Sequence, residues 1–178
     1  FLGPISPLLP ALRSMRSMRH YLVSVWMLAL TAAMAPRSRL VVISGVGSRG
    51  VGLGIARQVL ARDDTTEVVV MARALERAAS VAAELGPRAH ALQCDVRDEA
   101  SCAAVASAVE ALGGSELLAL VNNAGFAADL PWFPTPWPAS AASQTLAVNL
   151  FGAERLTRAL TPLLRKADDG RVVMVSSG

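Results

Sequence analysis

The chain has 178 residues with a formal net charge of +3, a size typical of one domain. Apolar residues make up 53% of it, which supplies a core and excludes a disordered chain. Its 17 basic residues are scattered, whereas nucleic-acid binding needs a concentrated basic face. Two cysteines outside any C-x-x-C pair and two histidines favour neither a disulfide framework nor a zinc site. We therefore expect no nucleic-acid partner and no metal.

The first 35 residues are expected to lie outside the fold. Met18–Ala35 has a basic start, an apolar middle and a small-x-small end, which is the layout of a secretory signal peptide. The apolar part is shorter than the roughly 20 residues that a membrane span needs. Alternatively, translation starts at Met34. We expect residues 1–35 to be a leader and 36–178 a domain, cytoplasmic for a start at Met34 and in the secretory pathway or ER for a signal peptide.

From Arg39 onward, short apolar runs alternate with helical stretches. The runs lack polar alternation, which indicates strands buried on both faces of a parallel sheet. The pattern predicts an α/β fold of the Rossmann type, doubly wound with helices on both faces. The expected strands are Leu40–Ile43, Val68–Met71, Ala89–Gln93, Leu117–Val121 and Val172–Val175. The expected helices are Gly50–Leu60, Leu75–Leu85, one capped by Asp95 and ended by Gly113-Gly114, and a long one over Ala139–Leu164 with Leu146, Leu150, Leu156 and Leu160 on one side.

A glycine-rich loop joins the first strand to the first helix. Gly45-x-Gly47-x-x-Gly50 matches the dinucleotide-binding pattern, and it has the strand–loop–helix context that the pattern requires. Glycines let backbone N–H groups approach a pyrophosphate, which also lies at the positive end of the helix dipole. A tight turn without a ligand is the alternative. The expected cofactor contacts in this loop are Gly45, Ser48, Arg49, Gly50, Val51 and Gly52.

The end of the second strand predicts which nucleotide binds. A carboxylate there would bind the ribose 2′-hydroxyl of NAD, but the sequence has Ala72 followed by Arg73. Arg49 lies in the glycine loop, so two guanidiniums would be available for a 2′-phosphate. We therefore expect NADPH/NADP+ as the cofactor. The alternative is that Arg73 and Arg77 belong to an exposed helix turn.

Four further segments together resemble the short-chain dehydrogenase/reductase family. They are Cys94-Asp95-Val96 after the third strand, the Asn-Asn-Ala-Gly sequence ending at Gly125, Val148–Gly152, and Gly170–Ser177. Their order and spacing extend the resemblance over nearly all of residues 39–178. Within the family, the NADPH carbonyl reductases are the most similar group, on the basis of Met71-Ala72-Arg73, Asn149–Gly152 and the stretch Leu160–Val173.

The resemblance implies roles for individual residues. Ser177 would hold the substrate carbonyl, with Ser176 as its alternative, and Asn149 would anchor a water relay. Asp95 and Val96 would contact adenine. The resemblance also implies that Asn122, Asn123, Ala124 and Gly125 fix the end of the central strand against the cofactor.

Two departures from the family pattern stand out. Ser44 replaces the usual threonine, and four residues instead of three separate Gly45 from Gly50. The Tyr-x-x-x-Lys pair of the family is absent from the sequence. Since the chain starts at Phe1 and stops after an apolar run, we interpret it as a fragment, C-terminally truncated and inactive by itself.

The expected function is NADPH-dependent reduction of a small-molecule carbonyl compound (a ketone, aldehyde or quinone) to an alcohol. A non-catalytic NADP-binding sensor or scaffold module is the alternative. A sterol or retinoid reductase at a membrane is a third hypothesis, and it requires the N-terminal apolar segment. Trp132, Phe133 and Trp137 are candidates to line the substrate mouth. Monomer and homo-oligomer both remain open.

Overall fold

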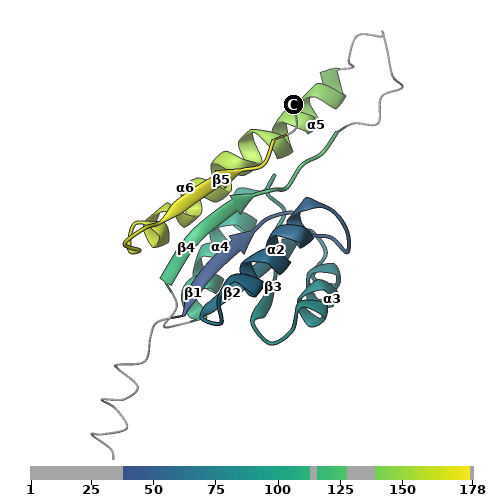
Figure 1. The fold of residues 1–178 in the computed structure, drawn as a ribbon. Coiled ribbons are helices and arrows are strands. Elements are labelled where there is room, and N and C mark those ends of the chain that lie inside the picture. Colours follow the sequence, from purple (N-terminus) through teal and green to yellow (C-terminus); the bar gives the residue numbers. More distant parts are fainter. Residues whose placement is uncertain (1–37, 113–115, 128–138, 177–178) are drawn as a thin grey trace, which may run out of the picture. The chain divides into compact units, whose positions relative to one another are not determined.

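The computed structural model describes residues 38–112, 116–127 and 139–176 (Figure 1). They belong to a unit that spans Arg37–Gly178, separate from a unit of Phe1–Pro36. The strands are β1 (Arg39–Ile43), β2 (Thr66–Ala72), β3 (Ala89–Gln93), β4 (Glu116–Asn122) and β5 (Arg171–Met174). The helices are α2 (Val51–Arg62), α3 (Leu75–Leu85), α4 (Glu99–Ala111), α5 (Ala139–Asn149) and α6 (Phe151–Leu164).

The described strands form one parallel sheet in the order β3-β2-β1-β4-β5. The chain builds outward from β1 to β3 and then crosses to the other side of β1 to add β4 and β5. The strand order therefore reverses between β1 and β4. In such sheets the crevice at the carboxyl ends of these two strands is the usual ligand site. The predicted Rossmann-type fold is confirmed.

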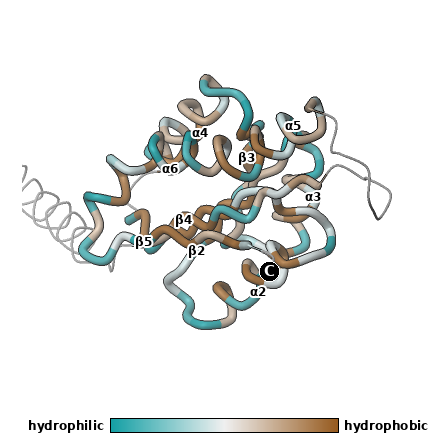
Figure 2. The backbone as a smooth tube through the Cα atoms, turned by 90° about the horizontal axis from the view of Figure 1, so that it is seen from above, coloured by the Kyte–Doolittle hydropathy of each residue, from teal (hydrophilic) through white to brown (hydrophobic). Residues whose placement is uncertain are grey.

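Alternating residues of the central strand supply two separate cores. Leu40 and Val42 of β1 pack with residues of α4 and α6 on one face of the sheet. Val41 and Ile43 pack with residues of α2 and α3 on the other face. In Figure 2 the strongly hydrophobic strands lie between α4 and α6 on one side and α2 on the other. This double burial explains why β1 is continuously apolar in sequence from Leu40 onward.

The long helix expected over Ala139–Leu164 is wrong, because the structure has two helices that meet at Leu150. Leu150 stays in the α region, and its N–H still bonds to the carbonyl of Leu146, but its φ of −109° lies outside the usual helical range. Of the two helices only α6 packs on the strands, and α5 has no fully buried residue, although Val148 packs partly against the core. Leu146 and Leu150 are consequently 48% and 54% exposed instead of continuing the buried stripe.

The expected cap of α4 is also wrong. Asp98, not Asp95, precedes the helix, and its carboxylate accepts a hydrogen bond from the backbone N–H of Ser101 at 2.8 Å. Asp95 lies one turn earlier, too far from the first free N–H groups to cap them. Its carboxylate bonds to Arg97 instead. The expected stop at Gly113-Gly114 lies outside the described residues.

At the amino-terminal edge of the sheet, Asp63 ends α2 and organises the turn into β2. Its carboxylate accepts hydrogen bonds of 2.8 Å from the N–H and hydroxyl of Thr65 and from the hydroxyl of Thr66. It also pairs with Arg39 at 3.2 Å. These bonds, led by the one from the Thr65 hydroxyl, lower the pKa of Asp63 to about 2.

Asp63→Asn is expected to lower the melting temperature at neutral pH. A carboxyl whose pKa is lowered by folding stabilises the protein above its unfolded pKa, and that contribution disappears as pH falls through the folded pKa. The difference in melting temperature should therefore shrink from about pH 4 to about pH 2. Thermal unfolding at a series of pH values tests this. A difference that stays constant over this range would contradict it.

Candidate functional site

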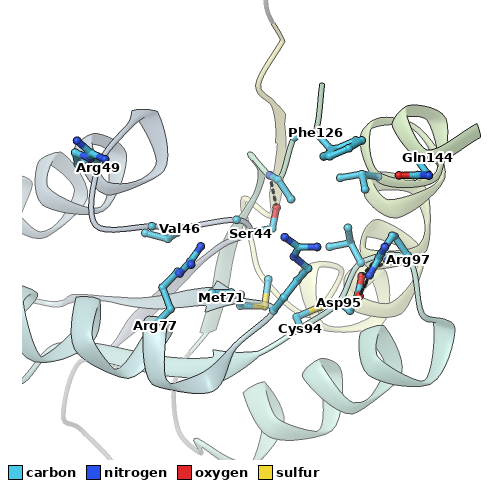
Figure 3. A pocket seen from close by; sticks show the side chains of 18 residues that line it. Ser44, Val46, Arg49, Met71, Arg77, Cys94, Asp95, Arg97, Phe126 and Gln144 are labelled. Carbon is cyan, nitrogen blue, oxygen red and sulfur yellow. Dashed lines mark hydrogen bonds and ion pairs between the residues drawn. The ribbon is translucent and has the colours of Figure 1, made fainter. Parts of the chain in front are cut away.

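A cavity of about 360 Å³ lies at the carboxyl ends of the central strands (Figure 3). Its walls come from the glycine-rich loop after β1, the ends of β2 and β4, the segment after β3, and one face of α5. It therefore opens at the switch in strand order. Seven residues predicted from the sequence line it: Gly45, Arg49, Arg73, Asp95, Val96, Ala124 and Gly125.

Two glycines shape the loop. Gly45 and Gly50 have φ of 67° and 101°, a region that favours glycine, whereas Gly47 does not. A Cβ on Gly45 would lie 2.5 Å from the Cα of Ala124, so β1 and β4 approach closely at this point. The loop thus depends on Gly45 twice, for its backbone conformation and for space.

The buried hydroxyl of Ser44 ties the ends of β1 and β4 together. It accepts hydrogen bonds from the N–H groups of Asn123 and Ala124, both at 3.0 Å. It also donates to the carbonyl of Val121 at 3.4 Å. Serine therefore supplies a hydroxyl at the position where the family pattern has threonine.

Ser44→Ala is expected to destabilise the protein by about 1–3 kcal/mol, because it removes the side-chain acceptor of two backbone N–H groups at a buried site. Urea unfolding measures the effect. Ser143→Ala, at an exposed position of α5, is the matched control and should change stability by less than about 0.5 kcal/mol. Equal effects of the two substitutions would contradict the assigned role of Ser44.

The asparagine that ends β4 and the one that follows it hold different elements. The Nδ2 of Asn123 donates to the carbonyls of Ser44 and Gly45 at 3.0 and 3.1 Å. A Cβ on Gly52 would lie 2.6 Å from that nitrogen, so the glycine leaves room for it. Asn122 donates instead to the hydroxyl of Thr157 on α6, at 2.9 Å. Together they fix the glycine loop and α6 to the end of the central strand.

The start of α2 is open to an anion. Its N-cap residue is Gly50, which has no side chain to bond the first N–H groups of the helix, and the first turn holds no acidic residue. The first N–H groups of a helix have no partner inside the helix, and they carry the positive end of its dipole. Val51 and Gly52 begin the helix here, beside the loop that Gly45 shapes.

The cavity is strongly basic. Among the described residues that line it, Asp95 is the one carboxylate, against the guanidiniums of Arg49, Arg73, Arg77 and Arg97. Figure 3 places Arg49 and Arg77 on the side of the glycine loop and the Asp95–Arg97 pair across the cavity. Hydrogen bonds from the Arg97 side chain are the main cause that lowers the pKa of Asp95, so this carboxylate stays charged.

Sequence reasoning missed Arg77 and Arg97 as lining residues. Arg77 follows Arg73 by four residues. Because this spacing brings side chains to one side of a helix turn, it could have predicted that Arg77 lies beside Arg73. Nothing in the sequence indicated that Arg97 would fold back onto Asp95.

A second cavity of about 1210 Å³ adjoins the first and includes Asn149. The Asn149 side chain pairs with the backbone of Phe126: its Oδ1 accepts from the N–H at 2.8 Å and its Nδ2 donates to the carbonyl at 3.0 Å. It therefore holds the segment that follows Gly125. The same cavity collects the remaining predicted loop and strand residues Gly50, Val51, Gly52, Asn122 and Asn123.

The remaining predicted site residues have different outcomes. Ser48 is exposed and lines neither cavity. Ser176 lines the larger cavity. Ser177 and the aromatic residues Trp132, Phe133 and Trp137 lie outside the described residues, as does the leader with Met34.

The part of the chain that the structure describes contains no group of three or more His, Cys, Asp or Glu residues able to hold a metal ion. None of its helices combines the length and the apolar character needed to cross a bilayer.

Comparison with known proteins assigns the family. The family of short chain dehydrogenases matches residues 39–178. The chain belongs to this family. This short-chain dehydrogenase is 34% identical over 140 residues to L-fucose dehydrogenase from Bos taurus. The aligned region covers 78% of this chain and 49% of that protein. The chain thus spans about half the length of the curated relatives it matches.

Solved structures of the family agree with the fold. A metagenomic short-chain oxidoreductase in complex with NADP has a TM-score of 0.66 and 32% identity, over 80% of this chain and 64% of that one. The 3-ketoacyl-(acyl-carrier-protein) reductase from Brucella melitensis, complexed with NADH, has a TM-score of 0.60 and 29% identity, over 72% of this chain and 50% of that one. Relatives with this fold therefore hold either nicotinamide cofactor, and the fold alone does not select between them.

Proposed function

We propose that this short-chain dehydrogenase is an NADPH-dependent oxidoreductase that reduces the carbonyl group of a ketone, aldehyde or quinone to an alcohol. The observation that carries the proposal is the basic cavity at the ends of β1 and β4, which is lined by four guanidiniums and adjoins a larger cavity that includes the uncapped start of α2. An alternative, a non-catalytic NADP-binding sensor or scaffold, uses the same cavity without turnover.

The pyrophosphate of the cofactor would lie at the start of α2. The backbone of Gly45–Gly52 has the positive-φ turns that let N–H groups face a ligand, and no carboxylate from the first turn competes for them. Ser48 adds an exposed hydroxyl in the same loop.

The 2′-phosphate would be held by Arg73, with Arg49 and Arg77 nearby. Arg73 follows β2 directly, at the position where a carboxylate would bind the 2′-hydroxyl of NAD. Planar guanidiniums bind phosphate through paired, charge-assisted hydrogen bonds. Since no carboxylate other than Asp95 lines the cavity among the described residues, its charge favours the more anionic cofactor.

The adenine ring would lie against the segment after β3. Asp95 offers a charged acceptor for the amino group, and buried Val96 supplies an apolar surface and a backbone N–H. The nicotinamide, when bound, supplies the hydride. Ser177 would hydrogen-bond the substrate carbonyl. Asn149 would anchor a water relay while its amide holds the Phe126 backbone beside the larger cavity.

The test uses the protein at its natural length. Oxidation of NADPH is followed by absorbance with a panel of ketones, aldehydes and quinones. The proposal expects carbonyl-dependent oxidation, faster with NADPH than with NADH. Saturable NADPH binding without turnover of any panel member would overturn the enzymatic proposal in favour of the binding module.

A further inference from the structure

The segment after β3 is a tight turn built around Asp95. The N–H of Asp98 donates to the carbonyl of Asp95 at 3.0 Å, which closes a four-residue turn. Inside it, the Oδ1 of Asp95 accepts the N–H of Arg97, also at 3.0 Å. An aspartate that bonds the backbone two residues on is a standard stabiliser of such turns.

The side chain of Arg97 then folds back onto the same carboxylate. Its Nε donates to Oδ1 at 3.0 Å and its terminal NH2 donates to Oδ2 at 2.5 Å (Figure 3). This is the two-pronged arrangement in which a guanidinium fixes the plane of a carboxylate as well as its position. Both side chains line the cavity.

The backbone that carries this pair is held from two sides. The N–H of Asp95 donates to the hydroxyl of Ser101 on α4 at 3.0 Å. Val96 packs against α6, where a Cβ on Gly152 would lie 2.6 Å from its Cγ2. The carboxylate is thus fixed before any ligand arrives, and among the described residues Arg97 is the one side chain that donates hydrogen bonds to it.

We propose that Arg97 is a positioning residue that holds the Asp95 carboxylate toward the exocyclic amino group of adenine, and so makes the protein select adenine over hypoxanthine dinucleotides. This rests on the proposed function, because it assumes that the cavity binds NADP(H). It adds a residue and a base selectivity that the motif itself does not assign.

The bonding capacity of the carboxylate supports this reading. An ionised carboxylate offers about four acceptor sites. Three N–H groups of Arg97 bind it: the backbone N–H binds Oδ1, the Nε–H is shared between Oδ1 at 3.0 Å and Oδ2 at 3.2 Å, and the terminal NH2 binds Oδ2. Three donors for about four acceptor sites leave room for one more. The 6-amino group of adenine is a donor, whereas the 6-oxo group of hypoxanthine is an acceptor and would face a carboxylate oxygen.

Two guanidiniums lower the pKa of Asp95, Arg97 on its own turn first and then Arg73 at the end of β2, while partial burial raises it. The neighbouring thiol of Cys94 lines the same cavity. Without Arg97 the pKa of Asp95 should rise toward the ordinary range for aspartate. As the pH falls, adenine recognition should therefore begin to weaken at a higher pH in the variant than in the wild type.

The experiment measures dissociation constants of the protein at its natural length for NADP+ and for its hypoxanthine analogue, by calorimetry. For Arg97→Gln, the constant for NADP+ should rise roughly 5- to 10-fold, since a positioned hydrogen bond is lost. The constant for the analogue should change less than about 2-fold. Arg97→Lys keeps the positive charge but loses the paired hydrogen bonds of the guanidinium, so it should weaken NADP+ binding by an intermediate factor.

Two controls separate positioning from a general effect. Arg165→Gln, at the exposed end of α6, should leave both constants unchanged. In an Asp95→Ala background, Arg97→Gln should have no further effect, because Arg97 acts through that carboxylate. In the wild type, NADP+ affinity should stay flat to a lower pH than in Arg97→Gln.

The outcomes also separate this inference from the proposed function. If the wild type binds neither dinucleotide, the proposed function fails. If it binds NADP+ but Arg97→Gln weakens both dinucleotides equally, or neither, Arg97 has no positioning role and the inference is overturned.

Discussion

Gly45→Ala is expected to destabilise the protein by about 2–5 kcal/mol and to abolish saturable NADPH binding. The residue has φ of 67°, a conformation that costs an L-residue free energy, and its new Cβ would lie 2.5 Å from the backbone of Ala124. Because the contact is with backbone, the loop and the end of β4 have to separate. Urea unfolding and calorimetric titration measure the two effects.

Two other glycines separate backbone strain from lack of space. Gly50 has φ of 101° but no heavy atom within 4 Å of its added Cβ, so Gly50→Ala should cost about 1–2 kcal/mol from conformation alone. Gly54 has neither problem and lies in α2, so Gly54→Ala should stabilise by about 0.5–1 kcal/mol. Equal losses at Gly45 and Gly54 would show that β1 and β4 do not approach as described.

Arg73→Asp is expected to reduce the preference for NADPH over NADH by roughly 100-fold. The substitution removes a charge-assisted bond to the 2′-phosphate and introduces the carboxylate that would bind a 2′-hydroxyl. The backbone at this position is held independently, since the carbonyl of Arg73 accepts a bond from the Nε2 of Gln93 at 3.0 Å. The measured quantity is the ratio of the two dissociation constants.

Arg165→Asp provides the charge-matched control for Arg73→Asp. It makes the same change of charge at the exposed end of α6, away from the cavity. It should leave the NADPH/NADH ratio within about 2-fold of the wild type. If Arg73→Asp left the ratio equally unchanged, its assignment to the 2′-phosphate would be wrong.

Much of the sheet was predictable because the inner strands β1 and β2 are almost fully buried, and continuous apolar runs such as Leu40–Ile43 identify such strands. The strand ends differ from the expected ones by no more than two residues. The burial expected of β5 is wrong, because Val172 and Val173 of this apolar edge strand are 43% and 45% exposed. The long helix was not predictable in the same way. Apolar spacing continues through Leu146 and Leu150, but whether those side chains reach a core depends on what packs against α5, and none of its residues is fully buried.

The location of the candidate site followed from topology. The glycine loop, Arg73 and Asp95 each come at the end of a strand, and in a parallel sheet those ends meet at one edge. The roles of these residues in binding stay predictions. The positions of Arg77 and Arg97 depend on side-chain directions in a helix start and a tight turn, which the residue pattern does not determine.

The most direct measurement is a titration of the protein at its natural length with NADPH and with NADH. We expect saturable binding at one site, with a smaller dissociation constant for NADPH than for NADH and with competition by NADP+. Absence of saturable binding, or tighter binding of NADH, would contradict the claim that guanidiniums at the ends of β1 and β2 hold a phosphorylated dinucleotide.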